Sequence, residues 1–131
     1  MDLETRQIAL VIARARAVNG LVMLLLPGLV ARALFGRAGS NAIARAMLRL
    51  VGVRDLALGI GAITTVKEGT MDAEWVGMGA VADAVDAAVT LLTPGLPKRT
   101  RLVAIVGGSA GLVGILTARA LADARPSEVD S

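Results

Sequence analysis

Long apolar segments that end at Pro-Gly pairs constrain this chain more than any other feature. The longest uncharged runs are residues 17–31 and 102–118, of fifteen and seventeen residues. No segment alternates polar and apolar residues with a period of two, so strands are not expected. The segments are also too apolar on all sides for helices on the surface of a water-soluble protein. The pattern therefore predicts an all-α protein.

The composition favours a membrane as the surroundings of these helices. Of the 131 residues, 55% are hydrophobic and 19% are charged, which is more apolar surface than one small aqueous core can hide. A clear transmembrane helix has about 18 or more apolar residues, and charges keep the uncharged runs here shorter. An alanine-rich soluble bundle, or a soluble carrier of lipid-like molecules, is the alternative.

We predict a four-helix transmembrane bundle in residues 1–122, followed by a polar tail in residues 123–131. The bilayer is its expected partner, with an apolar small molecule as a second candidate. No removable signal peptide is expected, because Asp2 and Glu4 replace the basic start of such a signal. The four helices are predicted at Ile8–Leu26, Leu50–Val66, Trp75–Leu92 and Leu102–Ala122. An amphipathic stretch from Asn41 precedes the second helix, and Leu29–Phe35 is predicted as a short interfacial helix.

Charges in the connecting loops predict the orientation in a cell membrane. The first loop with its flanks and the third loop together hold seven cations and no acid. The second loop, from Lys67 to Glu74, holds one cation and three acids. Basic loops stay on the cytoplasmic side, so loops one and three are predicted to be cytoplasmic and both termini outside. The seven cations are Arg32, Arg37, Arg45, Arg49, Lys98, Arg99 and Arg101.

Residue types that the chain lacks exclude several kinds of chemistry. Without Cys it has no disulfide scaffold and no thiol nucleophile, and without His it lacks the commonest metal ligand and general base. One Phe, one Trp and no Tyr provide no platform for stacking bases. We therefore expect no cofactor and no nucleic-acid partner.

Two segments of the chain resemble each other. Residues 18–32 and 85–99, which are 67 positions apart, are identical at eight of fifteen positions and share an L-L-x-P-G-L core. One interpretation is that this is simply how an apolar helix ends. The other is two repeated helical hairpins related by an axis along the membrane normal. Under the repeat, Arg16 corresponds to Asp83 and Asn19 to Asp86, at equal depths.

Ionisable residues inside the apolar segments mark the candidate site. Each costs about 2.5–3.5 kcal/mol or more at a helix centre unless it is paired or hydrated. Arg16 and Asp83 each lie eleven residues before a proline, roughly 16 Å from the helix end at 1.5 Å per residue. Arg14, two residues from Arg16, cannot face the same point. We predict a polar centre, with ligand-binding candidates Arg16, Asn19, Arg54, Asp55, Asp83 and Asp86.

This centre has two interpretations. It is either an ion-pair lock that fixes the order of the helices, or a site for a ligand, a proton or a reaction. As catalytic candidates, Asp83, Asp86, Asp55, Arg54 and Arg16 would act as acid and base on an apolar substrate. A metal held by the three carboxylates is not expected, because the arginines compete for the same oxygens.

Small residues form a stripe along the last helix. Gly107, Gly111 and Gly114 lie on one face, with Gly108 beside it, and such stripes let two helices approach closely in lipid. The stripe packs either within the bundle or against a second copy or another membrane protein.

Two stretches of the chain carry a resemblance: G-V-R-D-L-A-L-G from Gly52 to Gly59, and G-A-V-A-D-A-V-D from Gly79 to Asp86. With them, the chain resembles a group of small bacterial multi-pass membrane proteins that are catalogued as a domain of unknown function. The resemblance covers residues 8–122, implies the same topology and points to Arg54, Asp55 and Asp83 with Asp86. It implies no activity. The function classes that remain are an accessory or scaffold subunit, a ligand- or proton-handling protein, and a membrane-embedded hydrolase or isomerase.

Overall fold

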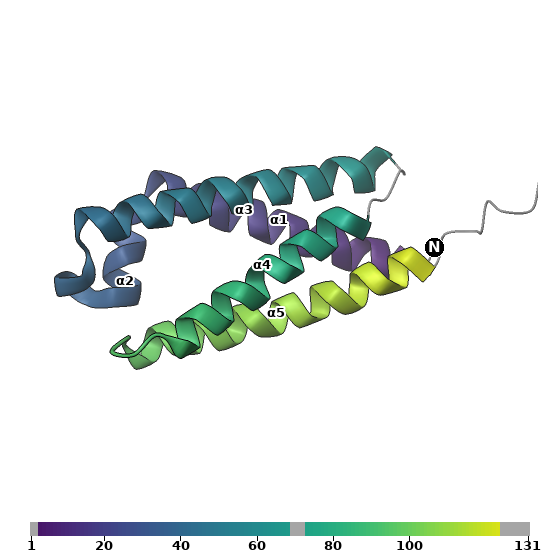
Figure 1. The fold of residues 1–131 in the computed structure, drawn as a ribbon. Coiled ribbons are helices and arrows are strands. Elements are labelled where there is room, and N and C mark those ends of the chain that lie inside the picture. The colour runs from purple at the N-terminus through teal and green to yellow at the C-terminus, as the bar shows by residue number, and fades with distance from the viewer. Residues whose placement is uncertain (1–2, 69–72, 124–131) are drawn as a thin grey trace, which may run out of the picture.

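The computed structural model of the protein describes residues 3–68 and 73–123, which form five helices (Figure 1). No strand occurs in these residues, so the all-α prediction is confirmed. The predicted count of four helices is not confirmed, because the expected interfacial segment is a helix of 13 residues. Residues 124–131 of the predicted tail lie outside the described residues. The helices are α1 (Leu3–Leu25), α2 (Pro27–Gly39), α3 (Ala42–Glu68), α4 (Ala73–Leu92) and α5 (Lys98–Asp123).

Local sequence explains the bends on either side of α2. Pro27 is the first residue of α2. A backbone N–H at this position forms no hydrogen bond within the helix, so a proline, which has no N–H, fits there without cost. Gly36 has a φ of 79°, a left-handed conformation that suits glycine, and it interrupts the helical geometry of α2. Asn41 caps α3, since its Oδ1 accepts a hydrogen bond from the N–H of Ala44 at 2.8 Å. As a result, α2 is a short element at one end of the molecule (Figure 1).

The four long helices pair as two hairpins, α1 with α3 and α4 with α5 (Figure 1). Within the first hairpin the backbones nearly touch: a Cβ at Gly20 would lie 2.5 Å from the backbone nitrogen of Leu56. A Cβ at Gly59 would likewise lie 2.7 Å from the backbone nitrogen of Ala17. Small residues permit this approach. The hairpins contact each other much less, and they diverge toward the end where α2 lies (Figure 1).

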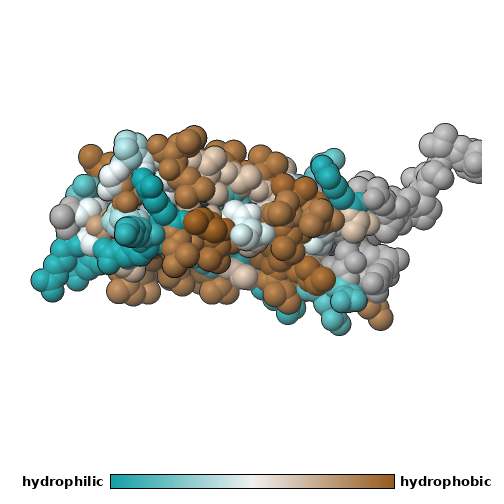
Figure 2. Space-filling model, turned by 90° about the horizontal axis from the view of Figure 1, so that it is seen from below, coloured by the Kyte–Doolittle hydropathy of each residue, from teal (hydrophilic) through white to brown (hydrophobic). Residues whose placement is uncertain are grey.

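Small side chains fill the interior, and large apolar side chains face outward. Leu92 is 82% exposed and Val106 is 63% exposed. Figure 2 shows apolar residues across the middle of one face and hydrophilic residues toward the two ends. This distribution is compatible with lipid surroundings, in which close packing of small residues holds helices together. The buried apolar residues are Ala9, Ala13, Ala31, Ala62, Ala80, Leu48, Leu58 and Val76.

Among the described residues, three helical segments are long and apolar enough to cross a membrane: Arg6–Leu25, Glu74–Leu92 and Lys98–Ala120. They belong to α1, α4 and α5. The helix α3 is not among them, because Arg54 and Asp55 lie near its middle and further arginines precede them. The structure is compatible with the predicted membrane protein, whereas a membrane crossing by four helices stays a prediction.

Candidate functional site

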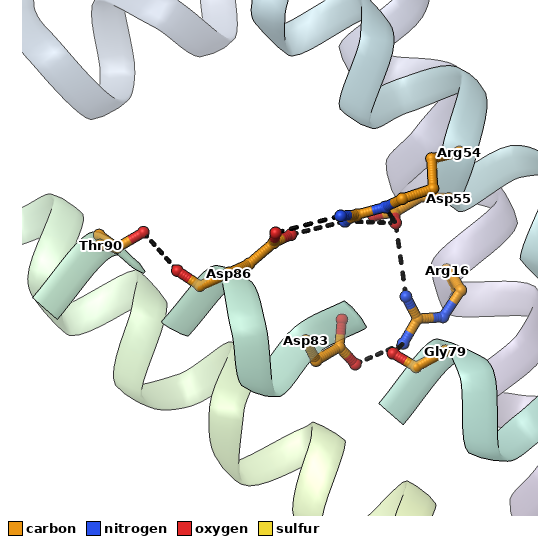
Figure 3. A network of polar contacts seen from close by, with 7 residues as sticks. All are labelled: Arg16, Arg54, Asp55, Gly79, Asp83, Asp86 and Thr90. Carbon is orange, nitrogen blue, oxygen red and sulfur yellow. Dashed lines mark hydrogen bonds and ion pairs between the residues drawn. The ribbon is translucent and has the colours of Figure 1, made fainter. Parts of the chain in front are cut away.

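Five charged side chains that the sequence singled out meet where the two hairpins face each other (Figure 3). They come from three helices, α1, α3 and α4. Asp83 and Asp86 share one face of α4 because they are three residues apart. We call the set the Arg/Asp network. It consists of Arg16, Arg54, Asp55, Asp83 and Asp86.

Arg16 is the inner cation of the network and joins all three helices. Its Nη1 donates a hydrogen bond to Oδ1 of Asp55 at 3.4 Å, and its Nη2 donates to Oδ2 of Asp83. The same Nη2 also donates to the backbone carbonyl of Gly79 at 2.9 Å. The side chain of Arg16 is only 10% exposed. A Cβ at Gly79 would lie 2.9 Å from Nε of Arg16, so glycine at this position makes room for the guanidinium.

Arg54 is the outer cation and binds Asp86 with two hydrogen bonds. Its Nη1 donates to Oδ1 of Asp86 at 3.1 Å, and its Nη2 donates to Oδ2 at 2.5 Å. The same guanidinium reaches back to Oδ1 of Asp55, which Nη2 approaches at 3.0 Å. This arm is more open than the inner one, since the side chains of Arg54 and Asp86 are 35% and 44% exposed. Bidentate arginine–carboxylate pairs fix the relative orientation of the two groups in addition to bringing their charges together.

The network has one more carboxylate than it has guanidinium groups. With every group ionised, two cations face three anions, and a net negative charge remains. All hydrogen bonds to Asp55 end on its Oδ1, and those to Asp83 end on its Oδ2. Among the described residues, Oδ2 of Asp55 and Oδ1 of Asp83 therefore have no hydrogen-bond partner. Neither of these two oxygens is fully buried.

These carboxylates form one wall of an open cavity of about 480 Å³, which we call the central groove. Asp55, Asp83 and Asp86 line it beside hydroxyl groups of Thr90 and Thr100. The rest of its wall is mainly apolar and comes from all five helices. It includes Met23, Leu34, Phe35, Leu48, Val51, Val89, Leu96 and Val103. The groove thus joins a long apolar surface to a group of hydrogen-bond acceptors.

Two other predicted residues lie apart from the ion pairs. Asn19 lines the central groove, but it is exposed and, among the described residues, has no hydrogen bond to the network. Arg14 is exposed and outside the network, as its angle from Arg16 on the helix predicts.

A contact that the sequence did not indicate ties α2 to the start of α5. The backbone carbonyl of Leu34 accepts hydrogen bonds from Nε of Arg99 at 3.1 Å and from Oγ1 of Thr100 at 2.5 Å. Leu34 lies two residues before Gly36, where the α2 helix is interrupted. Because the acceptor is a main-chain atom, no residue type in the sequence marks it. This link holds α2 at the end of the central groove.

The glycine stripe of α5 packs mainly within the chain. Gly111 and Gly114 are buried against α4, where Cβ atoms built on them would lie 2.8 Å from Cβ of Asp83 and 3.2 Å from Cβ of Ala80. Gly107 does not pack against another helix of the chain: a Cβ there would meet no atom within 4 Å, and the residue lines the central groove. Gly108 takes its place, since its Cβ would lie 3.0 Å from Cβ of Ala87. Gly107 and Gly108 are consecutive in α5 and point about 100° apart around the helix, so only Gly108 faces Ala87 of α4. The alternative prediction for the stripe, contact with a second copy or another membrane protein, stays a prediction.

Comparisons of the chain with models of known protein families, with curated proteins and with solved structures find no match. The Arg/Asp network and the central groove are therefore the features of the chain that bear on its function.

Proposed function

We propose that the protein is a multi-pass membrane protein that binds a small amphipathic molecule in the central groove. The observation that carries this proposal is that Asp55 and Asp83 line an open, mostly apolar cavity of about 480 Å³, while each keeps one carboxylate oxygen without a hydrogen bond from the described residues. A ligand with an apolar body and a polar head matches both parts of this surface.

The charge of the network indicates the kind of head group. An excess carboxylate and two unpaired acceptor oxygens favour a cation or a hydrogen-bond donor over an anion. An amine, an ammonium group or a hydroxyl group would satisfy these oxygens. A carboxylate or phosphate head would instead meet repulsion from three acids.

The geometry supports this function better than a purely structural role. A network that only locked the hairpins together would gain most from complete pairing in a filled interior, because unpaired buried acceptors are costly. Here the ion pairs do bridge the hairpins, yet the carboxylates that form them also line the open groove. The two roles coexist: Arg16 and Arg54 hold the carboxylates in place, and the same carboxylates offer acceptors to a ligand.

We infer that α1, α3, α4 and α5 all cross the membrane, with the end that carries α2 on the cytoplasmic side. The charges at the middle of α3 are compatible with this topology because Arg54 and Asp55 bind partners inside the bundle. The basic flanks of α2 and of the α4–α5 turn supply the excess of cations typical of cytoplasmic loops. Membership of the small bacterial group that the sequence resembles is part of the same proposal.

A groove-filling variant tests the function. Gly107→Leu places a side chain in the central groove where a Cβ meets no other atom, and Ser109→Leu adds a similar side chain to an exposed position on the same helix. The melting temperature of the detergent-solubilised protein would be measured with dodecylamine, dodecanol and dodecanoate. We expect dodecylamine to raise it most in the wild type and in Ser109→Leu, and to have little effect in Gly107→Leu.

Equal shifts in all three proteins would show that the probes act outside the groove and would overturn the proposal. Mass spectrometry of the recovered probe and of molecules that copurify with the protein adds a second readout. Recovery of chemically unchanged molecules supports binding alone, whereas conversion of a bound molecule would favour the hydrolase or isomerase class.

A further inference from the structure

A second cavity lies at the corner between α2 and α3, separate from the central groove. It is an open depression of about 470 Å³, and three of its lining side chains are arginines. We call it the arginine pocket. It is lined by Gly28, Leu29, Arg32, Arg37, Ser40 and Arg45.

The backbone at this corner brings the three guanidinium groups to one place. Arg32 comes from α2, Arg37 follows the interruption at Gly36, and Arg45 belongs to the first turn of α3. A Cβ at Gly28 would lie 3.7 Å from Cδ of Arg45, so the stem of Arg45 runs along the start of α2. The pocket thus depends on the turn between the two helices and is more than a row of charges along one helix.

These cations lie in a stretch of the sequence without acids. The sequence contains no Asp or Glu between Glu4 and Asp55. Within the described part of the chain, none of the three guanidinium groups forms an ion pair with a carboxylate. Three like charges around one space repel each other, and an anion bound between them would attract all three and offset that repulsion. Guanidinium groups match the oxygens of a phosphate particularly well, because they donate two parallel hydrogen bonds.

We propose that the arginine pocket binds a phosphate group, supplied by the head of an anionic phospholipid. The surroundings favour a lipid as the source of the phosphate. Leu29, which lines the pocket, is 65% exposed, and the neighbouring Leu25 and Leu26 are also exposed, so acyl chains would find apolar surface beside the bound head. The hydroxyl group of Ser40 offers a further donor to the phosphate. This site is independent of the ligand proposed for the central groove, whose carboxylates would repel a phosphate.

Calorimetric titration of the detergent-solubilised protein tests the site. The probes are dihexanoyl phosphatidylglycerol, dihexanoyl phosphatidylcholine and inorganic phosphate. The pocket variant Arg32→Gln/Arg45→Gln removes two charges from the pocket. The control Arg49→Gln/Lys98→Gln removes two exposed charges from the same end of the molecule but outside the pocket. We expect the pocket variant to lose about tenfold or more in affinity for phosphatidylglycerol, and the control to stay close to the wild type.

The other outcomes decide whether the phosphate comes from a lipid and whether it binds in the arginine pocket. If inorganic phosphate binds as tightly as phosphatidylglycerol, with the same loss in the pocket variant, the phosphate site stands and the lipid source is wrong. Equal losses in both double variants, or no loss in either, would overturn the site, because attraction to the basic end of the protein would explain the binding. Arg45→Lys, which keeps the charge, is a milder test if the double variant fails to fold. We expect it to weaken phosphatidylglycerol binding more than Arg49→Lys does.

Discussion

Arg16 on α1 and Asp83 on α4 are 67 residues apart, which is the offset of the internal repeat, and their side chains form an ion pair. Each lies eleven residues before the proline that follows its helix. The contact agrees with the equal depths that the repeat predicts for these positions. Arg16 and Asp83 stand at equivalent positions of the repeat and carry opposite charges, so they attract each other. Two arginines or two aspartates at these positions would repel each other.

Neutralising the inner acid should cost more stability than neutralising the outer one. Asp83→Asn removes a carboxylate that pairs with the guanidinium of Arg16, whose side chain is only 10% exposed. We therefore expect the free energy of unfolding to fall by about 1–3 kcal/mol. Asp86→Asn affects a pair that is about 40% exposed, and we expect a change within about 1 kcal/mol. Unfolding of both variants in mixed micelles with increasing sodium dodecyl sulfate measures the difference. A larger loss for Asp86→Asn would contradict the assignment of Arg16 as the inner cation.

Adding one methyl group at glycines of the first hairpin should be destabilising, and adding it in the groove should not. A Cβ at Gly59 would lie 2.7 Å from a backbone nitrogen of α1, which cannot move aside as a side chain can. We expect Gly59→Ala to lower the free energy of unfolding by about 1–3 kcal/mol. Gly107→Ala meets no atom, and its better helix propensity should leave stability unchanged or raise it by up to about 1 kcal/mol. Similar losses for the two variants in the same unfolding assay would argue against the close α1–α3 packing.

Removing the hydroxyl group that holds α2 should loosen α2 alone. Thr100→Val deletes the hydrogen bond to the carbonyl of Leu34 and leaves only the one from Arg99. We expect faster hydrogen–deuterium exchange in α2 peptides, with α1 and α3 unchanged, and faster release of a dodecylamine probe from the central groove. Thr93→Val is the control, because that exposed hydroxyl group bonds within its own segment, to the carbonyl of Val89. Unchanged exchange of α2 in Thr100→Val would show that this link does not hold the element in place.

The proposed orientation can be measured with single cysteines, because the natural chain has none. Ser40→Cys and Thr93→Cys lie at the α2 end, and Glu74→Cys lies at the start of α4, at the other end. Labelling with a membrane-impermeant maleimide, before and after lysis of the cells, reports the side on which each residue lies. We expect intact cells to label Glu74→Cys only. Labelling of the other two in intact cells would reverse the orientation.

The members of the candidate site could be predicted from the sequence, because charges are rare and costly in apolar helices. Counting residues back from Pro27 and Pro94 was enough to bring Arg16 and Asp83 to one depth. Their partners could not be assigned in the same way. Which acid binds which arginine depends on the rotation of each helix about its axis, and that rotation is set by glycines such as Gly59 and Gly111 packing against another backbone.

The sequence by itself determined the helical class, the apolar exterior and the five residues of the Arg/Asp network, since each follows from residue type and spacing along one helix. Only the tertiary structure decided which oxygens of Asp55 and Asp83 lack a hydrogen bond from the described residues, that Gly107 borders a groove, and that the carbonyl of Leu34 accepts a hydrogen bond from Thr100. These features arise between helices that are distant in the chain. They depend on the distance at which two helix surfaces meet or diverge, and no local pattern of residues records that distance.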